Sequence, residues 1–278
     1  QYHCNLCRCI NWFNVFIFLI NIPKGVIDID DYPAIKNWLL PFKEKLEKRA
    51  TKQEWFELQQ AQLAYQPYLV KPKIFYPDIT DRNKFYRDCE GLFASNTAYL
   101  LPISDEGITA YLNTKLVWFF LQGVCDSVRG GFLRMFSQNI SEIPIHQGLE
   151  NKKGVFIELE RMLHSKSKVR CLCERNFSRR LIDLCPDEQD FKLNKKLKNW
   201  WLLDFVGLQK EVKKAFKGVI SVAERNEWQD YFECQKDTRA GLNDEILALE
   251  DELNKEVYSM FNLTSDEICL IESAIKIS

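Results

Sequence analysis

Arg129 precedes Gly130 and Gly131 in a loop between a helix-like run and an alternating apolar run. An arginine side chain carries a rigid fork of N–H donors that fits the paired acceptors of phosphates and base edges. Two glycines beside it let a backbone approach a ligand closely, because they have no side chain. The alternative interpretation is a loop that only turns the chain and leaves Arg129 in solvent.

Cysteine and histidine are the other residue types that could do chemistry. The cysteines form two local groups, which are Cys4, Cys7 and Cys9 beside His3, and Cys171, Cys173 and Cys185. The first group has the C-x2-C spacing of zinc ligands, but no second such pair follows it. We therefore expect scattered reduced thiols, as in a cytoplasmic protein, and no metal site.

Catalytic motifs are missing from the sequence. It has no G-x-G-x-x-G, no G-x-x-x-x-G-K-[ST] and no H-E-x-x-H. Its three histidines, His3, His146 and His164, have no neighbours that indicate a catalytic triad. The sequence predicts that the chain catalyses nothing alone, and we name no catalytic residue.

The charged residues are unevenly distributed, although the net charge is only −1. Residues 152–217 hold 17 Lys/Arg against 9 Asp/Glu, whereas residues 218–278 hold 5 against 14. A basic block followed by an acidic tail indicates a polyanionic partner. Two solvated helical faces are the alternative interpretation.

The apolar run at residues 10–22 has 13 residues, and a spanning helix needs about 20. Its β-branched and aromatic content predicts a buried strand, so we expect no membrane partner. Because the sequence starts with Gln1, we expect a fragment or a processed product.

The first half of the chain predicts helices mixed with short strands. A helix begins at Pro33, and its apolar face consists of Ile35, Trp38, Leu39 and Phe42. Residues 66–80 contain three prolines, which predicts a short strand near a sheet edge. Residues 91–103 predict a strand, a turn and a second strand.

The clearest predicted helix covers residues 107–122 and ends at Gly123. Its shared face consists of Ile108, Tyr111, Leu112, Leu116, Phe119 and Phe120. Alternation then predicts a strand at 132–136, with Phe132, Arg134 and Phe136 on one side and Leu133 and Met135 on the other. The loop 124–131 lies between this helix and this strand.

From about residue 149 the pattern predicts a basic, irregular stretch and then helices. A nearly heptad seam consists of Leu242, Ile246, Leu249, Leu253, Val257 and Met260. The seam is short, so an antiparallel hairpin within the chain is favoured over a dimeric coil. Thr264 starts a T-x-x-E capping box for one last helix.

We therefore predict an α+β fold. Residues 1–148 form a small mixed sheet with packed helices, and residues 149–278 form a helical region with a short coiled-coil-like hairpin.

Several segments, in this order, resemble the TaqI-like C-terminal specificity domain: "VIDIDDYPAIKNWLLPFKEKLEKRATKQEWFELQ", "KIFYPDI", "FASNTAYLLP" and "YLNTKLVWFF…G…GGFLRMFSQNISEIPI". The similarity covers roughly residues 22–146, and residues 187–273 look like the helical tails of such proteins. The Cys-rich opening and residues 147–186 have no counterpart, so the roles of Cys4, Cys7 and Cys9 stay open.

The resemblance implies target recognition within an adenine-specific DNA methyltransferase or a fused type IIG restriction-modification enzyme of phage defence. In that family a preceding catalytic half binds S-adenosylmethionine and holds the flipped adenine with an Asn-Pro-Pro-Tyr motif. Neither motif occurs in this sequence, so this chain would hold no cofactor itself. Its expected partners are double-stranded DNA and the methyltransferase domain of the same parent chain.

On this resemblance, the predicted base contacts are Arg129, Arg134, Gln138 and Asn113. The predicted contacts to the DNA backbone are Lys115, Gly130, Gly131, Lys71, Lys73, Arg82, Lys84, Lys195, Lys196 and Lys198. Internal pairing of Arg134 is one alternative. The other is that Lys71, Lys73, Arg82, Lys84 and Arg87 form ordinary surface ion pairs with Asp78, Asp81 and Asp88. Trp200 and Trp201 are interpreted as core anchors. A rival function is an assembly module whose seam docks a partner protein or a second copy.

Overall fold

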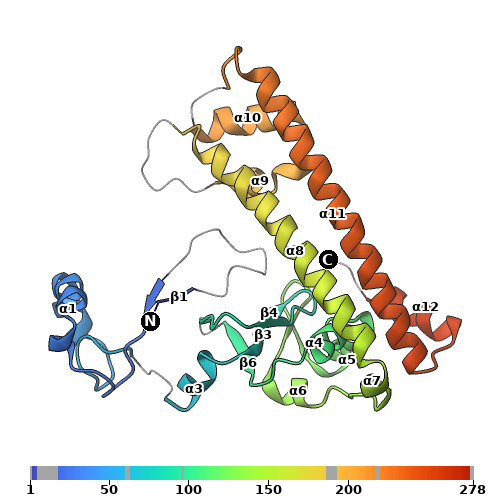
Figure 1. The fold of residues 1–278 in the computed structure, drawn as a ribbon, viewed down its shortest axis with the longest axis horizontal. Helices are drawn as coiled ribbons and strands as arrows, with labels where there is room; N and C mark the ends of the chain where they lie inside the picture. The colour runs from blue at the N-terminus through green and yellow to red at the C-terminus, as the bar shows by residue number, and fades with distance from the viewer. Residues whose placement is uncertain are drawn as a thin grey trace. The chain divides into compact units, whose positions relative to one another are not determined.

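The computed structural model shows short strands and helices followed by long helices (Figure 1). It describes residues 2–4, 18–59, 63–94, 97–185, 193–216 and 220–275. Most of the predicted strand at 10–22 lies outside these residues, as do Cys7 and Cys9. Its last residues form strand β2 (Phe18–Ile20), which pairs antiparallel with β1 (Tyr2–Cys4).

The chain divides into two compact units. The first unit contains Gln1–Asp105 and Phe120–Ile143, and the second, the helical unit, contains Glu106–Phe119 and Pro144–Lys276. The predicted boundary near residue 148 places residues 106–119 in the first domain. In the structure these residues pack with the helical unit instead.

The first unit contains a three-stranded sheet with the order β5-β3-β6. Its strands are antiparallel and consist of β5 (Tyr86–Asp88), β3 (Lys73–Pro77) and β6 (Ala98–Leu101). Ile74, Phe75 and Tyr76 are all buried. The prediction of an edge strand was therefore wrong, because the prolines lie before and at the end of β3 and leave its centre free to pair on both sides.

A second antiparallel sheet has the order β4-β8-β7. It consists of β4 (Ile79–Thr80), β8 (Phe132–Arg134) and β7 (Asp126–Val128). The predicted alternation is confirmed, since Leu133 and Met135 are buried and Phe132 and Arg134 are exposed. The predicted strand 132–136 is shorter than expected because helix α6 (Ser137–Ser141) follows it.

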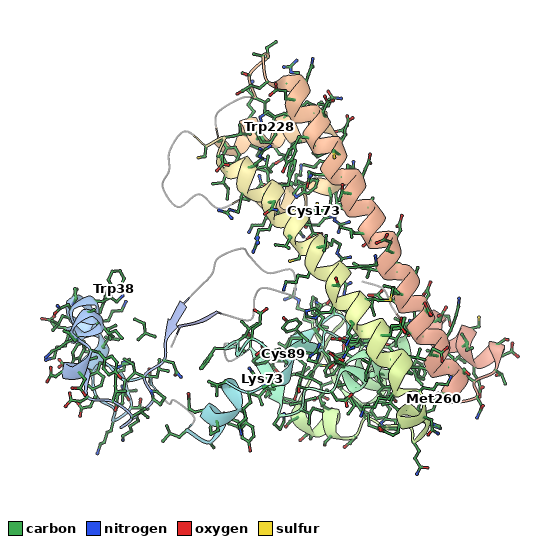
Figure 2. All side chains as sticks on the ribbon, in the orientation of Figure 1. Trp38, Lys73, Cys89, Cys173, Trp228 and Met260 are labelled. Carbon is green, nitrogen blue, oxygen red and sulfur yellow. The ribbon has the colours of Figure 1, made fainter. Side chains whose placement is uncertain are left out.

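The helical segments near the start of the first unit keep little of their apolar surface buried. They consist of η2 (Ile29–Asp31), α1 (Pro33–Leu39), η3 (Leu40–Phe42) and α2 (Lys43–Glu47). Two further short pieces are η4 (Leu63–Tyr65) and α3 (Gln66–Leu69). Pro33 starts α1 as predicted, but Trp38 is 69% exposed and Phe42 is 50% exposed (Figure 2). The predicted apolar face is therefore not packed into a core.

The predicted single helix 107–122 is two helices, α4 (Glu106–Leu112) and α5 (Lys115–Val124). Thr114 causes the break, because its hydroxyl donates to the Tyr111 carbonyl at 2.8 Å and caps the amide of Val117 at 3.5 Å. The break shifts the helical phase, so Val117, Trp118 and Leu121 are buried in α5 in place of the predicted face. Helix α5 also continues past Gly123, which does not end it.

The helical unit is built on two long antiparallel helices, α8 (Lys153–Ile182) and α11 (Arg225–Met260), which lie side by side (Figure 1). Lys166 pairs with Glu245 at 2.7 Å, and Arg239 pairs with Glu174 at 2.9 Å. The predicted seam is buried between them, apart from the half-buried Leu242. The intrachain hairpin is confirmed, but the stretch predicted as irregular is the continuous helix α8.

An aromatic cluster fills one end of this hairpin. Phe177 of α8 stacks on Trp200 with ring centroids 4.0 Å apart and on Tyr231 at 5.5 Å. Trp200 is fully buried, which confirms it as a core anchor. Figure 2 shows Trp228 near the start of α11 and Met260 at its end. The remaining elements are α7 (Gly148–Asn151), α9 (Lys195–Lys198), η5 (Trp200–Leu202), α10 (Phe205–Phe216) and α12 (Ser265–Ala274).

The last helix and the fold class agree with the sequence. Thr264 and Glu267 form the predicted capping box at the start of α12. Small antiparallel sheets and a large helical region make the fold α+β. Every strand pair in the described residues is antiparallel, where a mixed sheet was expected. In the part of the chain that the structure describes, no helix combines the length and apolar character that crossing a membrane requires.

Candidate functional site

Arg129 lies at the tip of a β-hairpin formed by β7 and β8. Val128 pairs with Phe132, so residues 129–131 make a three-residue loop, closed by the Gly131 amide donating to the Val128 carbonyl at 3.2 Å. Gly130 and Gly131 have φ of +91° and +80°, which other residues adopt only with strain. The predicted loop 124–131 is thus mostly helix end and strand, and Arg129 is exposed at its turn.

Neighbouring elements hold this hairpin in place. On its other edge β8 pairs with β4, with Ile79 opposite Arg134 and Thr80 opposite Leu133. The Asn139 side chain of α6 donates to the carbonyl of Val124 at 2.6 Å, just before β7 begins. The loop carrying Arg129 is therefore mounted on a paired sheet edge and an anchored helix end.

Arg134 has two partners in the structure. Its Nε lies 3.5 Å from Asp78 Oδ1, and its guanidinium carbon lies 4.9 Å from the centre of the Phe136 ring. The side chain is still 45% exposed. Internal pairing, the alternative considered for this residue, is what the structure has.

Gln138 and Asn113 lie on different elements. Gln138 is exposed on α6. Asn113 follows α4, and its amide donates to the Thr109 carbonyl at 3.0 Å. That contact is the packing or capping hydrogen bond expected of an asparagine at a helix end.

Lys73 was predicted to contact the DNA backbone, and this is corrected. Its side chain is fully buried on β3, forms an ion pair with the equally buried Asp88 of β5, and donates to the Leu69 carbonyl at 2.7 Å. Asp88 also accepts the amides of Glu90 and Leu92, each at 2.8 Å. Lys73 therefore joins two strands inside the first unit and cannot reach a phosphate.

The other predicted basic residues of this unit lie on the surface. Lys71 and Arg82 are exposed, and Lys84 pairs with Asp81 at 2.5 Å. Burial opposes ionisation of Asp81, but the hydrogen bond and charge of Lys84, with the charge of Arg82, outweigh it and lower the pKa of Asp81. Lys84 is therefore engaged in a local ion pair. Arg82 also lies 3.8 Å from Asp81, but its side chain is 67% exposed.

Three predicted lysines lie on or beside α9 in the helical unit. Lys195 and Lys196 are exposed, and Lys198 is half-buried. Lys196 pairs with Glu211 at 2.8 Å, and this contact lowers the pKa of the Glu211 carboxyl. Lys195 and Lys196 remain on the surface, where a polyanion could contact them.

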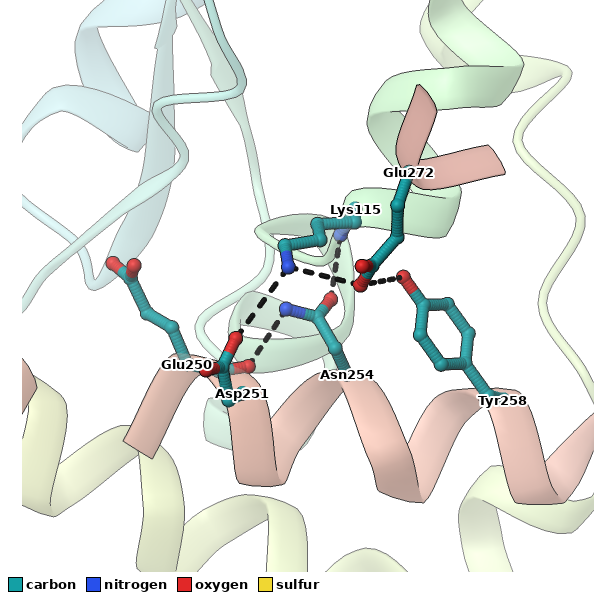
Figure 3. Close-up of polar contacts among 6 residues, drawn as sticks. All are labelled: Lys115, Glu250, Asp251, Asn254, Tyr258 and Glu272. Atoms are coloured by element: carbon teal, nitrogen blue, oxygen red, sulfur yellow. Dashed lines mark hydrogen bonds and ion pairs between the residues drawn. The ribbon is translucent and has the colours of Figure 1, made fainter. Parts of the chain in front are cut away.

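Lys115 belongs to a polar network of the helical unit (Figure 3). Its ammonium lies 3.0 Å from Glu272 and 3.4 Å from Asp251, and its amide donates to Asn254 Oδ1 at 2.7 Å. Burial alone would lower the pKa of Lys115, but the two carboxylates raise it above its usual value. The network ties α5 to α11 and α12, so the predicted phosphate contact is corrected to a structural role.

The predicted site is therefore divided between the two units. The first unit carries Arg129, Gly130, Gly131, Arg134, Gln138, Lys71, Arg82 and Lys84 on its surface. The helical unit carries Asn113, Lys115, Lys195, Lys196 and Lys198. Sequence reasoning missed Asn139 and Asn254, whose side chains anchor elements beside these positions. The sequence did offer one signal for Asn254, because it is a polar residue directly after Leu253 of the apolar seam.

Across the described ranges no cluster of three or more His, Cys, Asp or Glu side chains could hold a metal ion. Cys173 is buried on α8, donates to Gln235 Oε1 at 3.3 Å and has a raised pKa, chiefly through burial. That environment makes it a packed thiol and a poor nucleophile.

Known proteins resemble both parts of the chain. Residues 21–145 match the family model described as the TaqI-like C-terminal specificity domain. The resemblance predicted from the sequence is confirmed. The match includes the hairpin with Arg129, and it ends two residues after Ile143, where the segment Phe120–Ile143 of the first unit ends.

Residues 149–257 match a second family model, described as a domain of unknown function (DUF8810). These residues include α8, α10 and most of α11. A type II methyltransferase, M.BstVI of Geobacillus stearothermophilus, is 26% identical over 156 residues. This alignment covers 52% of the present chain and 27% of the relative, so the chain spans well under half of that protein.

Proposed function

We propose that this chain selects the target sequence in double-stranded DNA for a methyltransferase of a restriction-modification or phage-defence system. The match of residues 21–145 to a specificity domain carries the proposal. The similarity to a type II methyltransferase supports the same setting. We further propose that the parent enzyme transfers a methyl group from S-adenosylmethionine to adenine N6, with its catalytic residues outside these 278 residues.

Division of labour between recognition and catalysis has a physical reason. A base must leave the stack before its exocyclic amine can be methylated, which costs about a few kcal/mol. A domain that grips the duplex offsets that cost and determines which adenine is presented. Its side chains must reach base edges from a rigid support.

Arg129 is the side chain best placed for this task in the first unit. It is exposed on a tight turn, and the hairpin below it is paired on both edges of β8. A bidentate contact to guanine O6 and N7 would contribute about 1–3 kcal/mol of discrimination against other bases. The adjacent glycines leave room for a sugar or phosphate beside the turn.

The position of the seam argues against the rival function as an assembly module. The seam that would dock a partner is buried between α8 and α11 of the same chain, with Val257 fully buried and Leu253 2% exposed. A surface already used for intrachain packing is unavailable to a second copy.

Selection from a random duplex pool would test the proposal. The unaltered chain should enrich one sequence. Arg129→Ala should relax the preference at a guanine of that sequence by about 5- to 150-fold, which corresponds to about 1–3 kcal/mol. Arg129→Lys keeps the charge but loses the fork, so it should also relax the preference. Arg82→Ala, which removes another exposed arginine of the first unit, should leave the preference intact. Failure to enrich any sequence would sink the proposal.

A further inference from the structure

The long helix α8 carries an unusual excess of positive charge. Over its full length it holds 8 Lys/Arg against 3 Asp/Glu, and within residues 161–182 the balance is 7 against 1. On the antiparallel partner α11 the balance is reversed, with 4 Lys/Arg against 10 Asp/Glu. One helical hairpin therefore separates its charges between its two members.

The positive residues of α8 form a stripe on one face. Arg161, Lys168 and Arg175 are seven residues apart, and Arg179 follows four residues later. Positions seven apart stay on one face of a helix. Phe156, Cys173, Phe177 and Leu181, which pack inward, lie on the opposite face. Lys168 and Arg179 are exposed, Arg175 is half-buried, and Arg161 pairs with Glu106 at 2.8 Å.

Helix α11 carries a matching acidic stripe. Asp230, Asp237 and Asp244 are again seven residues apart, and all three are exposed. Their face of α11 is opposite the buried positions Phe232, Ile246 and Leu253. Both stripes therefore point away from the interface between the two helices, so the hairpin does not neutralise one with the other.

This separation of charge makes the hairpin less stable than it would be if the two stripes faced each other. Arg175 and Arg179 are four residues apart on one helix, where like charges repel each other. Acidic side chains on α11 that faced them would remove this repulsion. A polyanionic ligand on this face would offset the repulsion between Arg175 and Arg179.

We propose that the outer face of α8, centred on Lys168, Arg175 and Arg179, binds the phosphate backbone of double-stranded DNA that flanks the recognised sequence. The proposal rests on the proposed function, which supplies duplex DNA as the polyanion near this chain. The three residues span about 16 Å at 1.5 Å per residue. Duplex DNA presents about one phosphate per 1.7 Å of axis, so several phosphates lie within that length.

Polar residues between the basic ones fit the same ligand. Ser165 and Asn176 are exposed on this face and can donate hydrogen bonds to phosphate oxygens. The acidic stripe on α11 repels a polyanion, so it leaves α8 as the contact face of the hairpin. The surface carries no sequence information itself, because phosphates are the same in every sequence.

The test uses the full chain and a charge-neutralised triple variant, Lys168→Gln, Arg175→Gln, Arg179→Gln. Glutamine keeps the helix propensity and the polarity of these positions. Fluorescence anisotropy with one duplex, at about 50 to 200 mM salt, gives the slope of log Kobs against log salt. The triple variant should lower that slope by about 2 to 3 and weaken binding roughly 10- to 100-fold at the lowest salt.

The matched control is the acidic triple variant Asp230→Gln, Asp237→Gln, Asp244→Gln on the other helix. It should bind DNA as tightly as the unaltered chain or more tightly, because it removes repulsion. Equal loss of DNA binding in both variants would overturn the proposal. So would sedimentation that shows the unaltered chain self-associating at low salt and both variants monomeric, since the two stripes would then pair between copies.

A second readout separates this inference from the proposed function. The α8 variant should select the same sequence as the unaltered chain from a random duplex pool, only more weakly, whereas Arg129→Ala should alter the selected sequence. An unchanged salt slope in the α8 variant, with sequence selection intact, would overturn the role of α8 and leave the proposed function standing. No DNA binding by the unaltered chain would overturn both. Circular dichroism melting of the variants checks that the hairpin remains folded.

Discussion

Each of the two units of this chain is stabilised by a different kind of contact. In the first unit, strands of two to five residues surround a buried ion pair between Lys73 and Asp88. In the helical unit, Phe177 and Trp200 lie in a continuous apolar core between long helices. Small sheets bury few apolar side chains, so a specific polar contact has a large share in fixing their register.

The difference matters for what each unit can do. An apolar seam tolerates substitutions of similar volume and keeps two long helices aligned. A buried ion pair is stable only when both partners are present, but it fixes one strand against another. A unit built of short strands leaves turns such as the one with Arg129 exposed, and a unit built of long helices offers extended faces.

Phe177→Ala should have the largest effect on the helical unit. It removes a fully buried ring that contacts Trp200 and Tyr231, so the free energy of unfolding should fall by about 3 to 5 kcal/mol. Hydrogen exchange of α8 and α11 would measure the loss in that unit. Phe132→Ala, at a 38% exposed position, is the control and should change little. A loss below about 1 kcal/mol for Phe177→Ala would contradict the assigned core.

Asp88→Ala should have a comparable effect on the first unit. It leaves the Lys73 ammonium buried without a counter-charge, at a cost of about 3 to 5 kcal/mol. Hydrogen exchange of β3 and β5 should rise, while α8 and α11 stay protected. The double variant Lys73→Met, Asp88→Leu removes both charges and should recover most of the loss. A double variant no more stable than Asp88→Ala would contradict the ion-pair explanation.

Sequence reasoning predicted the parts of the fold whose signals are local. The seam through Leu253 and Val257 depends on a period within one helix, and the cap at Thr264 depends on four adjacent residues. The turn at Gly130 and Gly131 likewise needs only its own residues to be recognised. In each of these cases the pattern can be recognised from residues that lie close together in the sequence.

Contacts between distant residues could not be predicted in the same way. Lys73 looks like any surface lysine until strand register places it opposite Asp88, 15 residues away. Helix α8 has a narrow apolar stripe among many charged residues, so its period was hidden in the sequence. Lys115 acquires its role only through Asp251 and Glu272, which are more than 130 residues away.

Asn254→Ala should have a smaller effect than either core change. Asn254 is 4% exposed, accepts from the Lys115 amide and donates to the Glu250 carbonyl, both at 2.7 Å. Its loss leaves the first amide of α5 without a partner, at about 1 to 3 kcal/mol. Thermal melting of the full chain, with hydrogen exchange of α5, would measure the loss. Asn243→Ala, which removes a half-buried contact to Arg170, is the control and should cost less.

The smallest expected effect is a loss of stability of the helical unit in alkali. The pKa of Lys115 is raised by Glu272 and Asp251, and that of Tyr258 is raised first by burial and then by Glu272. Both groups hold a proton more tightly when folded. Their stabilisation is therefore fully present below the unfolded pKa values of about 10 and is lost as pH rises through the higher folded values.

Solvent screening keeps this effect modest, because the Lys115 side chain is 38% exposed. Lys115→Met should flatten the fall in melting temperature between about pH 9 and pH 11 without abolishing it, since Tyr258 still titrates. Lys166→Met is a matched control, because Lys166 also pairs with a carboxylate of α11, at Glu245, but lies apart from the tyrosine. If Lys115→Met and the unaltered chain lost stability along the same curve, the ion pairs of Lys115 would contribute nothing to holding α5 against α11 and α12. Of the polar contacts in this network, only the hydrogen bond that Asn254 accepts from the Lys115 amide would then help to hold α5 on α11, beside the apolar packing of Val117 and Trp118.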